Sequence, residues 1–527
     1  MASSFVLLLF SLLACNGYKI LVYSPIIWYS HTNFMGTLAD ILTEAGHNVT
    51  VLMPLMDPAQ KDKTGLKITK NIIMVPTDPR VLRMKEFEKD ILSDIWNMKP
   101  SIFELNRAWA ATNMQAMFPF QCERVINDKP LMERLEKEKF DLGMAEFISA
   151  CGLGIIEAVK IPASVVVYSV VYHDLIAQLI GEPSIPSYVP GYMSASSDRM
   201  NLLERFKNAV DMIFGHNFFL NMYRREIEVI RARFGSDFKN YEQLVVESSL
   251  VLSNSNPYLD FPRPMLYKTV PIGGISFSKR IENNKLSEKW NTILDKRNRT
   301  VLVSFGTVMK AIFMPEQYKK TLLDVFKSMP ETTFIMKYEE EDSKIVNHLP
   351  NVYLATWLPQ KELLADPRVT VFVTHAGLGS TTEIAYTGKA SLLIPIFADQ
   401  LRNANMLARH GGAIVLSKFD LENKEKLKDS LRSLLNDERY SQNAKRLSEM
   451  LRNQPISPKE LFIRHIEFAA RFGRLPNLIS YGTQLSFLQY YFLDIFLAFF
   501  LTIIAAIYLI FKTFSKCFQS SPKIKND

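Results

Sequence analysis

Short apolar runs alternate with amphipathic stretches along most of the first half of the chain. Residues 18–24 (YKILVYS) and 49–53 are apolar runs that predict buried strands. Between them, residues 33–45 have apolar positions at helical spacing and end at Gly46, a residue type that often stops a helix. Three further runs predict strands, at residues 72–75, 142–145 and 163–167. Strands that alternate with helices indicate a parallel sheet of Rossmann type.

A second alternating series begins with the strand predicted at residues 301–305 and continues to about Arg452. The polar residues 278–299 lie between the two series and predict a linker. Between residues 174 and 237 the pattern is irregular, and PSIPSYVPGYMSASSDR predicts a long loop of the kind that serves binding. Aromatic helices around residues 95–120 could pack in the core, bind an apolar acceptor or touch a membrane. The pattern predicts two Rossmann-like domains, residues 18–277 and 300–454.

Apolar runs at both ends of the chain predict a membrane-anchored protein. Residues 5–14 have the length of a signal-peptide core and are too short to span a bilayer, so we expect residues 1–17 to be removed. Residues 495–511 contain no charge, and we expect a transmembrane helix at residues 490–511. Lysines follow in residues 512–527, which places this tail in the cytoplasm and the body in the lumen.

The most informative segment is residues 357–400, WLPQKELLADPRVTVFVTHAGLGSTTEIAYTGKASLLIPIFADQ. The uncharged run Val369–Thr374 predicts a strand that is covered on both faces. A turn with His375 and Gly377 follows, and then a helix that begins near Ser380. A strand, a glycine turn and a helix N-terminus direct free N–H groups and the positive end of the helix dipole at one point. That arrangement suits a diphosphate.

Four more side chains of this segment are placed for the rest of a nucleotide sugar. Trp357 can stack on a uracil ring, a contact worth roughly 1–3 kcal/mol by analogy with base stacking. Glu383, one turn into the helix, can accept hydrogen bonds from a ribose diol. Asp399 and Gln400 follow the strand predicted at residues 391–395, at the carboxyl end where ligands of open α/β sheets bind.

This segment resembles the signature of the UDP-glycosyltransferase family, which includes the animal UDP-glucuronosyltransferases. NPYLDFPRPMLYKTVPIGGI at residues 256–275 and VLVSFGTV at residues 301–308 are similar to the same family, and the likeness covers nearly the whole chain. The resemblance implies a GT-B fold, in which two Rossmann-like domains face a cleft. It also implies that residues 455–489, with a helix at 458–472, pack back on the N-terminal domain.

By the same resemblance, one set of residues binds the donor. Those implied to hold UDP are Gly306, Thr307, Trp357, Gln360, His375, Gly377, Ser380 and Glu383, and those implied to hold the sugar are Asp399 and Gln400. Gly379 stands where many relatives have Asn, so we expect weaker donor binding or altered donor choice.

Transfer of a sugar to an alcohol needs a base that titrates near neutral pH. His31 follows the first strand, in a loop at the rim of the first domain, and is the candidate base. Relatives typically have Asp after a strand that starts Phe-Asp; this chain has Glu146 there, which we expect to fix the tautomer of His31. The resemblance implies inversion at the anomeric carbon. The sequence has no Asp-x-Asp metal motif, and we expect helix N–H groups and His375 to neutralise UDP without a metal or another cofactor.

The charges and cysteines fit a lumenal enzyme. The net charge of +8 does not indicate nucleic-acid binding, because four lysines lie in the tail and the other charges are well mixed. Cys122 and Cys151 are the two cysteines left for the lumenal body, and a disulfide between them is one of two open alternatives. The sequons at Asn48 and Asn298 become available in that compartment. The last residues, KIKND, resemble a dilysine retrieval signal and favour the endoplasmic reticulum membrane.

We interpret the chain as a type I membrane UDP-glycosyltransferase that moves glucuronic acid, glucose or a similar sugar to a hydroxyl of small lipophilic acceptors. One alternative is a glucosyltransferase dedicated to a single endogenous lipid. Another is a non-catalytic, membrane-anchored protein that binds a UDP-sugar or a lipophile. His31 and the complete donor segment favour an enzyme, whereas Gly379 and Glu146 favour the non-catalytic protein. A homo-oligomer is compatible with the sequence.

Overall fold

The computed structural model describes residues 17–85, 94–98, 114–277 and 286–519. The expected signal peptide and the KIKND motif lie outside these residues. So do the first part of the expected linker and most of the aromatic stretch at residues 95–120. Within the described residues the chain divides into two units, residues 1–478 and residues 479–527.

The first half of the larger unit is built on a seven-stranded parallel sheet in the order β3-β2-β1-β4-β5-β6-β7. The strands are β1 (Lys19–Tyr23), β2 (Asn48–Pro54), β3 (Asn71–Val75), β4 (Leu142–Glu146), β5 (Ala163–Tyr168), β6 (Leu250–Ser253) and β7 (Thr269–Pro271). The helices are α2 (Tyr29–Glu44), α3 (Pro79–Lys85), α6 (Met114–Ile126), α7 (Lys129–Glu138), α8 (Cys151–Ala158), α9 (Asp174–Leu179), α10 (Leu202–Phe234) and α11 (Tyr241–Val246). Alternate residues of β1 enter different cores, Leu21 on one face and Ile20 on the other, so both faces of the sheet are covered.

The second half is built on a six-stranded parallel sheet in the order β10-β9-β8-β11-β12-β13. The strands are β8 (Arg299–Ser304), β9 (Thr332–Lys337), β10 (Val352–Ala355), β11 (Val369–Thr374), β12 (Ala390–Leu393) and β13 (Ala413–Val415). The helices are α12 (Glu288–Leu294), α13 (Glu316–Lys327), α14 (Gln360–Ala365), α15 (Leu378–Thr387), α16 (Gln400–Ala408), α17 (Lys424–Asn436) and α18 (Glu438–Arg452). Short 3-10 helices lie at Pro58–Gln60, Ala311–Phe313, Lys344–Val346, Lys418–Glu422 and Pro476–Leu478. The expected pair of Rossmann-type sheets is confirmed.

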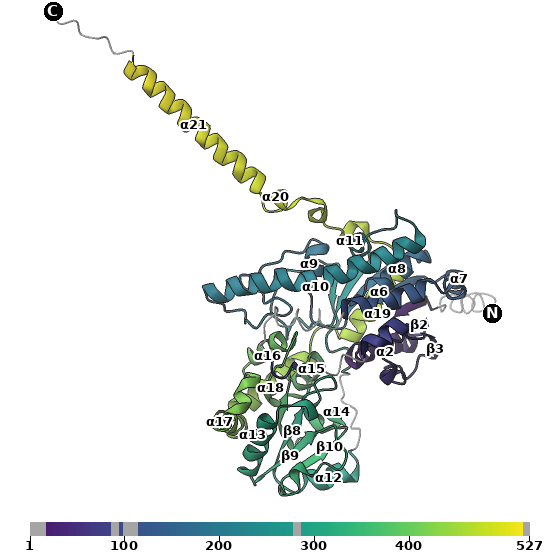
Figure 1. Cartoon of the computed structure of the whole chain (residues 1–527), viewed down its shortest axis with the longest axis vertical. Helices are drawn as coiled ribbons and strands as arrows, with labels where there is room; N and C mark the ends of the chain where they lie inside the picture. Colours follow the sequence, from purple (N-terminus) through teal and green to yellow (C-terminus); the bar gives the residue numbers. More distant parts are fainter. Residues whose placement is uncertain (1–16, 86–93, 99–113, 278–285, 520–527) are drawn as a thin grey trace, which may run out of the picture. The chain divides into compact units, whose positions relative to one another are not determined.

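Helix α19 (Pro458–Phe472) returns to the first sheet from near the end of the larger unit. It contacts α2, β5 and β7, and Figure 1 shows it beside α2. Its buried residues Phe462, Ile466 and Ala469 belong to the same core as Ile20 of β1. The last helix of this unit therefore completes the cover on one face of the N-terminal sheet.

Helix α10 occupies about half of the region, residues 174–237, where the sequence predicts irregular structure. It is 33 residues long and starts at a capping box, in which Asn201 accepts from the Glu204 amide and Glu204 accepts from the Asn201 amide. Its apolar residues are spread around the helix, which obscures a clear amphipathic period in the sequence. The long loop that we predict immediately before it is present as turns and irregular chain.

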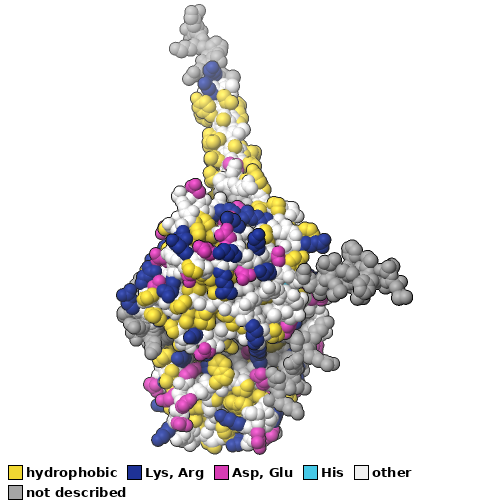
Figure 2. Space-filling model, turned by 90° about the vertical axis from the view of Figure 1, so that its right-hand side faces the viewer, with side chains coloured by type: hydrophobic (Ala, Val, Ile, Leu, Met, Phe, Trp, Pro, Cys, Tyr) yellow, Lys and Arg dark blue, Asp and Glu magenta, His cyan; other side chains and the backbone are white. Residues whose placement is uncertain are grey.

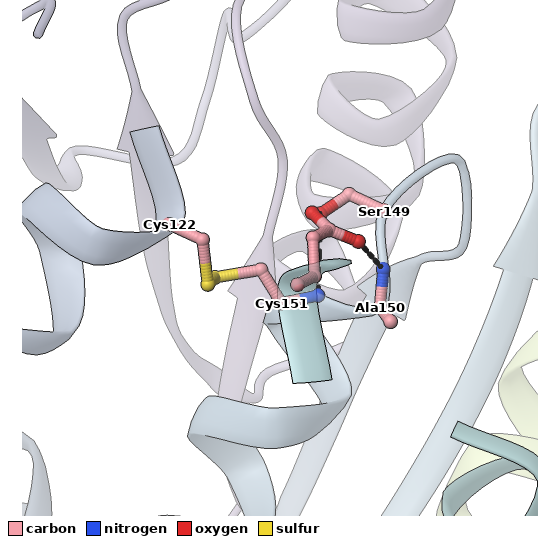
Figure 3. The surroundings of a disulfide bond; sticks show 5 residues. Cys122, Ser149, Ala150 and Cys151 are labelled. Carbon is pink, nitrogen blue, oxygen red and sulfur yellow. Dashed lines mark hydrogen bonds between the residues drawn. A yellow bond between two sulfur atoms is a disulfide. The ribbon is translucent and has the colours of Figure 1, made fainter. Parts of the chain in front are cut away.

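A disulfide joins Cys122 of α6 to Cys151 at the start of α8 (Figure 3). The two cysteines are 29 residues apart in sequence, and both are buried. Of the two alternatives left open by the sequence, the structure has the bonded pair. Beside it, Glu226 of α10 accepts hydrogen bonds from Ser149 Oγ at 2.5 Å and from the Ala150 amide at 2.7 Å.

The smaller unit contains a 3-10 helix at Tyr481–Gln484, the short helix α20 (Phe487–Tyr490) and the long helix α21 (Leu493–Gln519). Residues 493–516 of α21 have a mean hydropathy of 2.6 and are long and apolar enough to cross a membrane. Figure 2 shows apolar side chains over the visible length of this helix, with basic side chains gathered towards its end. The helix extends beyond the expected span of residues 490–511.

Candidate active site

The candidate base lies where β1 ends and α2 begins. Trp28 is extended and forms the N-cap of α2, and the His31 amide donates to the Trp28 carbonyl at 3.0 Å. The expectation that His31 lies in a loop before a helix at residues 33–45 is therefore wrong, because the helix starts at Tyr29. The first helical turn holds the imidazole more firmly than a loop would, with 13% of the side chain exposed.

Glu146 is the last residue of β4 and faces His31 directly. Strands β1 and β4 are neighbours in the sheet, with Tyr23 paired to Ala145, so their carboxyl ends meet at one edge. The Nδ1 atom of His31 lies 2.5 Å from Oε1 of Glu146. The longer side chain of Glu therefore still reaches the imidazole. When Nδ1 carries the proton and donates it to Glu146, the other ring nitrogen, Nε2, has a lone pair that can accept a proton.

A third side chain, Ser169, joins this pair and was missed in the sequence analysis. It follows the adjacent strand β5, and its Oγ lies 2.6 Å from His31 Nδ1 while it also donates to Glu146 Oε1. A serine directly after a buried strand that neighbours β4 is the signal that could have identified it. The His31 imidazole is thus held at Nδ1 by two groups from two strands.

The electrostatic surroundings of His31 come from both halves of the chain. Burial lowers the pKa of His31, and this is the largest single influence. The carboxylate of Glu146, by charge and by hydrogen bond, and the charge of Asp399 together outweigh it, so that the pKa of His31 is raised above its usual value. Burial in turn raises the pKa of Asp399, and the charge of His31 opposes that rise. A side chain implied to hold the sugar therefore lies within electrostatic reach of the base.

The turns after β8 and β11 approach each other closely in the second half. Gly306 has φ +87°, and a Cβ there would lie 2.6 Å from Cε1 of His375. A Cβ on Gly377 would lie 2.6 Å from Nε2 of the same ring. Both positions require glycine, so these turns are built around the imidazole of His375. Thr307, beside Gly306, is exposed on the same turn.

His375 does not supply positive charge at neutral pH. Burial, with a smaller contribution from the charge of Lys337, lowers the pKa of His375 to about 4. The neutral ring can donate a hydrogen bond to a phosphate oxygen, so the expected part of His375 in neutralising UDP stays a prediction. Lys337, at the carboxyl end of β9, is one cationic side chain of this region, and burial lowers its pKa. Its Nζ donates to the Gly306 carbonyl at 2.5 Å and lies 5.5 Å from the centre of the Trp357 ring.

Helix α15 presents its N-terminus directly after this turn. Its N-cap is Gly377, and no side chain caps the first turn, so main-chain N–H groups remain available to an anion. The helix ends at Thr387, with Gly388 in the left-handed region at φ 68°, which is the predicted stop. Gly379, exposed in the first turn, has open space around the position of a Cβ.

Three of the residues implied to bind UDP contact one another. Gln360, the first residue of α14, donates from Nε2 to Glu383 Oε2 at 2.5 Å and to Ser380 Oγ at 3.3 Å. Burial raises the pKa of Glu383 despite the hydrogen bond from Gln360. Trp357 lies nearby with 56% of its surface exposed, and its ring centre is 6.4 Å from that of Tyr29. The indole thus lies near the helix that carries His31 and has free surface for a planar ligand.

Asp399 and Gln400 form the start of α16, after β12. Gln400 Oε1 accepts from the amides of Ile396 at 2.9 Å and Phe397 at 3.1 Å, which folds the preceding turn and directs its NH₂ group elsewhere. Asp399 Oδ2 accepts from Asn403 Nδ2 at 2.8 Å. Among the described residues, no group of three or more His, Cys, Asp or Glu side chains could hold a metal ion.

The sequence matches the family model described as "UDP-glucoronosyl and UDP-glucosyl transferase" over residues 19–526. The chain is similar to ugt-47 of Caenorhabditis elegans, with 27% identity over 507 residues that cover 94% of this chain and 93% of that protein. It is also similar to the human UDP-glucuronosyltransferase 1A10, with 25% identity over 505 residues that cover 94% of this chain and 92% of the human protein.

Solved structures show the same architecture. The glycosyltransferase VinC has a TM-score of 0.54 and 18% identity, and the match covers 86% of this chain and 100% of VinC. The spinosyn rhamnosyltransferase SpnG has a TM-score of 0.54 and 16% identity, over 85% of this chain and 100% of SpnG. At these identities the likeness concerns the fold, which is the GT-B arrangement of two Rossmann-type sheets.

Proposed function

Because the chain belongs to the family of UDP-glucuronosyl and UDP-glucosyl transferases, and so is a hexosyltransferase, we propose that it moves a hexosyl group from a UDP-sugar to a hydroxyl of a small lipophilic acceptor, with His31 as the base. The observation that carries this proposal is the pair of His31 and Glu146, whose Nδ1 and Oε1 atoms lie 2.5 Å apart, with the charge of Asp399 from the second half also acting on His31. The base follows a strand of the first sheet, and the charge that acts on it from the second half belongs to Asp399, which we propose binds the sugar.

The donor is held by the second half in this proposal. Trp357 stacks on the uracil. Glu383 accepts hydrogen bonds from the ribose diol and the Gln360 NH₂ group donates to a ribose oxygen, which requires Gln360 to release part of its contact with Glu383. The free N–H groups at the start of α15, the exposed hydroxyl of Thr307 and the ammonium of Lys337 surround the position of the diphosphate. Asp399 and the free NH₂ group of Gln400 bind hydroxyls of the sugar.

The reaction follows from this placement. The acceptor hydroxyl gives its proton to Nε2 of His31 as its oxygen bonds to the anomeric carbon. The bond from that carbon to the diphosphate oxygen breaks on the opposite face, UDP leaves with the electron pair, and the anomeric centre inverts. The imidazolium that forms is stabilised by Glu146, which accepts from Nδ1–H, and by the nearby charge of Asp399. No step in this scheme calls for a metal or a further cofactor.

We further propose that α21 anchors the enzyme as a single-pass type I protein of the endoplasmic reticulum membrane, with the two sheets in the lumen. The length and hydropathy of α21 support an anchor, and the lysines after its apolar part support the orientation. A lumenal body is also the setting in which the disulfide between Cys122 and Cys151 forms readily.

The test is sugar transfer by the detergent-solubilised full chain, with UDP-glucose, UDP-glucuronic acid and other UDP-sugars offered against a phenol, and with products identified by mass. We expect His31→Ala to abolish product with at least one donor that the wild type uses. His348→Ala is the matched control, because His348 is an exposed histidine of the second half, and it should leave turnover unchanged. Equal turnover by wild type and His31→Ala would refute the base, and UDP-sugar binding without product from any acceptor would favour the non-catalytic alternative.

A further inference from the structure

A short segment of the first half is buried inside the core of the second half. Trp96 is fully buried and Ile95 nearly so, and both belong to a core whose other buried members lie between residues 301 and 434. Met98 packs against the same core. Residues 95–98 therefore contribute apolar side chains to a sheet that is formed, some 200 residues later, by another part of the chain.

The Trp96 ring packs directly beneath the turn after β8. Its centre lies 5.4 Å from that of Phe305, at an angle of 73°. Phe305 precedes Gly306, whose carbonyl accepts from Lys337 and whose Cα lies against His375. An edge-to-face contact with a fully buried ring fixes the position of Phe305, and so of the backbone that follows it.

A buried lysine connects the same segment to the turn after β12. Nζ of Lys418 donates to the Ile95 carbonyl at 2.5 Å and to the Ile396 carbonyl at 3.3 Å. Burial lowers the pKa of Lys418 to about 8, so the side chain remains largely protonated at neutral pH. The Ile396 amide in turn donates to Gln400 Oε1. One ammonium thus joins the inserted segment to the turn that carries Asp399 and Gln400.

We propose that the segment around Ile95 and Trp96 is a positioning element for the donor, which holds the phosphate turn at Gly306 and the sugar turn at Asp399 in their binding geometry. The inference rests on the proposed function, since it assigns these turns to a UDP-sugar. Trp96 acts through Phe305, and Lys418 acts through Ile396, so neither residue needs to touch the ligand. Part of the donor affinity is then supplied by the half of the chain that holds the acceptor base.

The test measures binding of UDP to the full chain in detergent by calorimetry. Trp96→Ala releases the phosphate turn, so we expect the UDP affinity to weaken by about 10- to 100-fold. Lys418→Met acts on the sugar turn, which UDP does not reach, so we expect it to raise the KM for the UDP-sugar by a similar factor and to leave the UDP affinity within about threefold of wild type. Trp96→Phe keeps a ring against Phe305 and should restore the affinity to within about threefold of wild type. In turnover, the KM for the UDP-sugar should rise more than kcat falls.

Phe326→Ala is the matched control. Phe326 is fully buried in the same core and stacks on Phe334 at 4.1 Å. Phe334 pairs with Val301 near the start of β8, which is the end of the strand away from Phe305. This variant should lower the melting temperature as Trp96→Ala does and leave the UDP affinity unchanged.

The outcomes separate the inference from the proposed function. Equal UDP affinity of Trp96→Ala and Phe326→Ala, together with an equal KM of Lys418→Met and wild type for the UDP-sugar, would overturn the positioning role alone, provided that the wild type binds UDP. A wild type with no affinity for UDP would overturn both proposals. Should Trp96→Ala fail to fold, Lys418→Met and Trp96→Phe still give the comparison.

Discussion

Replacement of Glu146 by Gln tests the pairing on which the base depends. The variant keeps the size of the side chain and removes the carboxylate that lies 2.5 Å from Nδ1 of His31. Two consequences follow. The imidazolium formed during transfer loses its nearest negative charge, and burial is left as the main influence on the imidazole, so that the pKa of His31 falls.

The magnitude follows from Coulomb's law and from the opposing cost of burial. Two unit charges at 3–4 Å interact by about 4–6 kcal/mol at an effective dielectric constant of 20. Part of this stabilisation is offset by desolvation of the imidazolium, so we take about 3–5 kcal/mol as the loss in the transition state. Since 1.4 kcal/mol corresponds to tenfold in rate, kcat/KM should fall by roughly 10²- to 10⁴-fold on the plateau.

The assay is kcat/KM for one UDP-sugar and one phenol between pH 5 and 9. Activity rises with pH as His31 loses its proton, because only the neutral imidazole can accept one. In Glu146→Gln the inflection should move to lower pH while the plateau falls. Glu146→Asp keeps the charge and shortens the side chain, and we expect a plateau between those of wild type and Glu146→Gln. An unchanged inflection with a plateau within threefold of wild type would refute the assignment of Glu146.

Four further outcomes are expected. Gly379→Asn enters open space in the first turn of α15, so one added hydrogen bond should strengthen UDP binding by about 2- to 10-fold in calorimetry, and weaker binding would contradict this. The double variant Cys122→Ser and Cys151→Ser removes a disulfide that closes a loop of 29 residues. Its free energy of unfolding in urea should be about 3–4 kcal/mol lower than that of the wild type, and an unchanged midpoint would contradict this expectation. Burial raises the pKa of Glu226 from 4.5 to about 8, so the folded state holds a proton that the unfolded state has lost. The wild type should therefore lose up to roughly 4–5 kcal/mol of stability as the pH rises from about 5 to 8. Glu226→Gln should reduce this loss in melting temperatures measured across that pH range, and the same pH dependence in wild type and variant would refute it. Asn298 is exposed, so we expect it to carry a glycan when the chain is made in the presence of microsomes. Asn298→Gln should remove the decrease in gel mobility that an endoglycosidase also removes, and a wild type whose gel mobility does not change with the endoglycosidase would contradict a lumenal body.

Local periodicity predicted much of the fold. The runs at residues 18–24, 49–53, 72–75, 142–145 and 163–167 agree with β1 to β5 to within about two residues at each end. Strands β1, β2, β4 and β5 are buried on both faces, so each sequence is a nearly uninterrupted apolar run with few alternatives. The edge strand β3 is partly exposed, and its apolar run was recognised all the same. The weaker strands β6, β7, β9, β10 and β13 were not identified, because they are only three to six residues long and such short segments fit several structures.

The donor segment could be read from sequence because it is continuous. One strand, one turn and one helix bring His375, Gly377 and Glu383 together without help from distant residues. The contact between His31 and Glu146 spans 115 residues, and the sequence suggested it through the family resemblance, in which relatives have Asp at the position of Glu146. The structure supplies the physical reason, since His31 follows β1, Glu146 ends β4, and the carboxyl ends of these paired strands share one edge of the sheet.

The side chains that were missed depend on contacts that no local pattern encodes. Ser169 needs the order of β4 and β5 in the sheet, and Lys337 needs the approach of β9 to the turn at Gly306. Trp96 shows the limit most clearly, since its partners lie more than 200 residues away. In sequence these residues are an ordinary serine, a strand-end lysine and an apolar aromatic, and only tertiary structure gives each a specific neighbour.

The charge interaction between His31 and Asp399 also couples the two halves of the chain energetically. The charge of Asp399 raises the pKa of His31, and the charge of His31 lowers that of Asp399, so each group favours the ionised form of the other. In the proposed function, hydroxyls of the donor sugar donate hydrogen bonds to Asp399 and so stabilise its carboxylate. The carboxylate in turn favours the imidazolium that forms when the acceptor loses its proton. We therefore expect binding of the donor in one half to raise the pKa of the base in the other, which would give the two-sheet arrangement a chemical reason beyond the enclosure of the substrates.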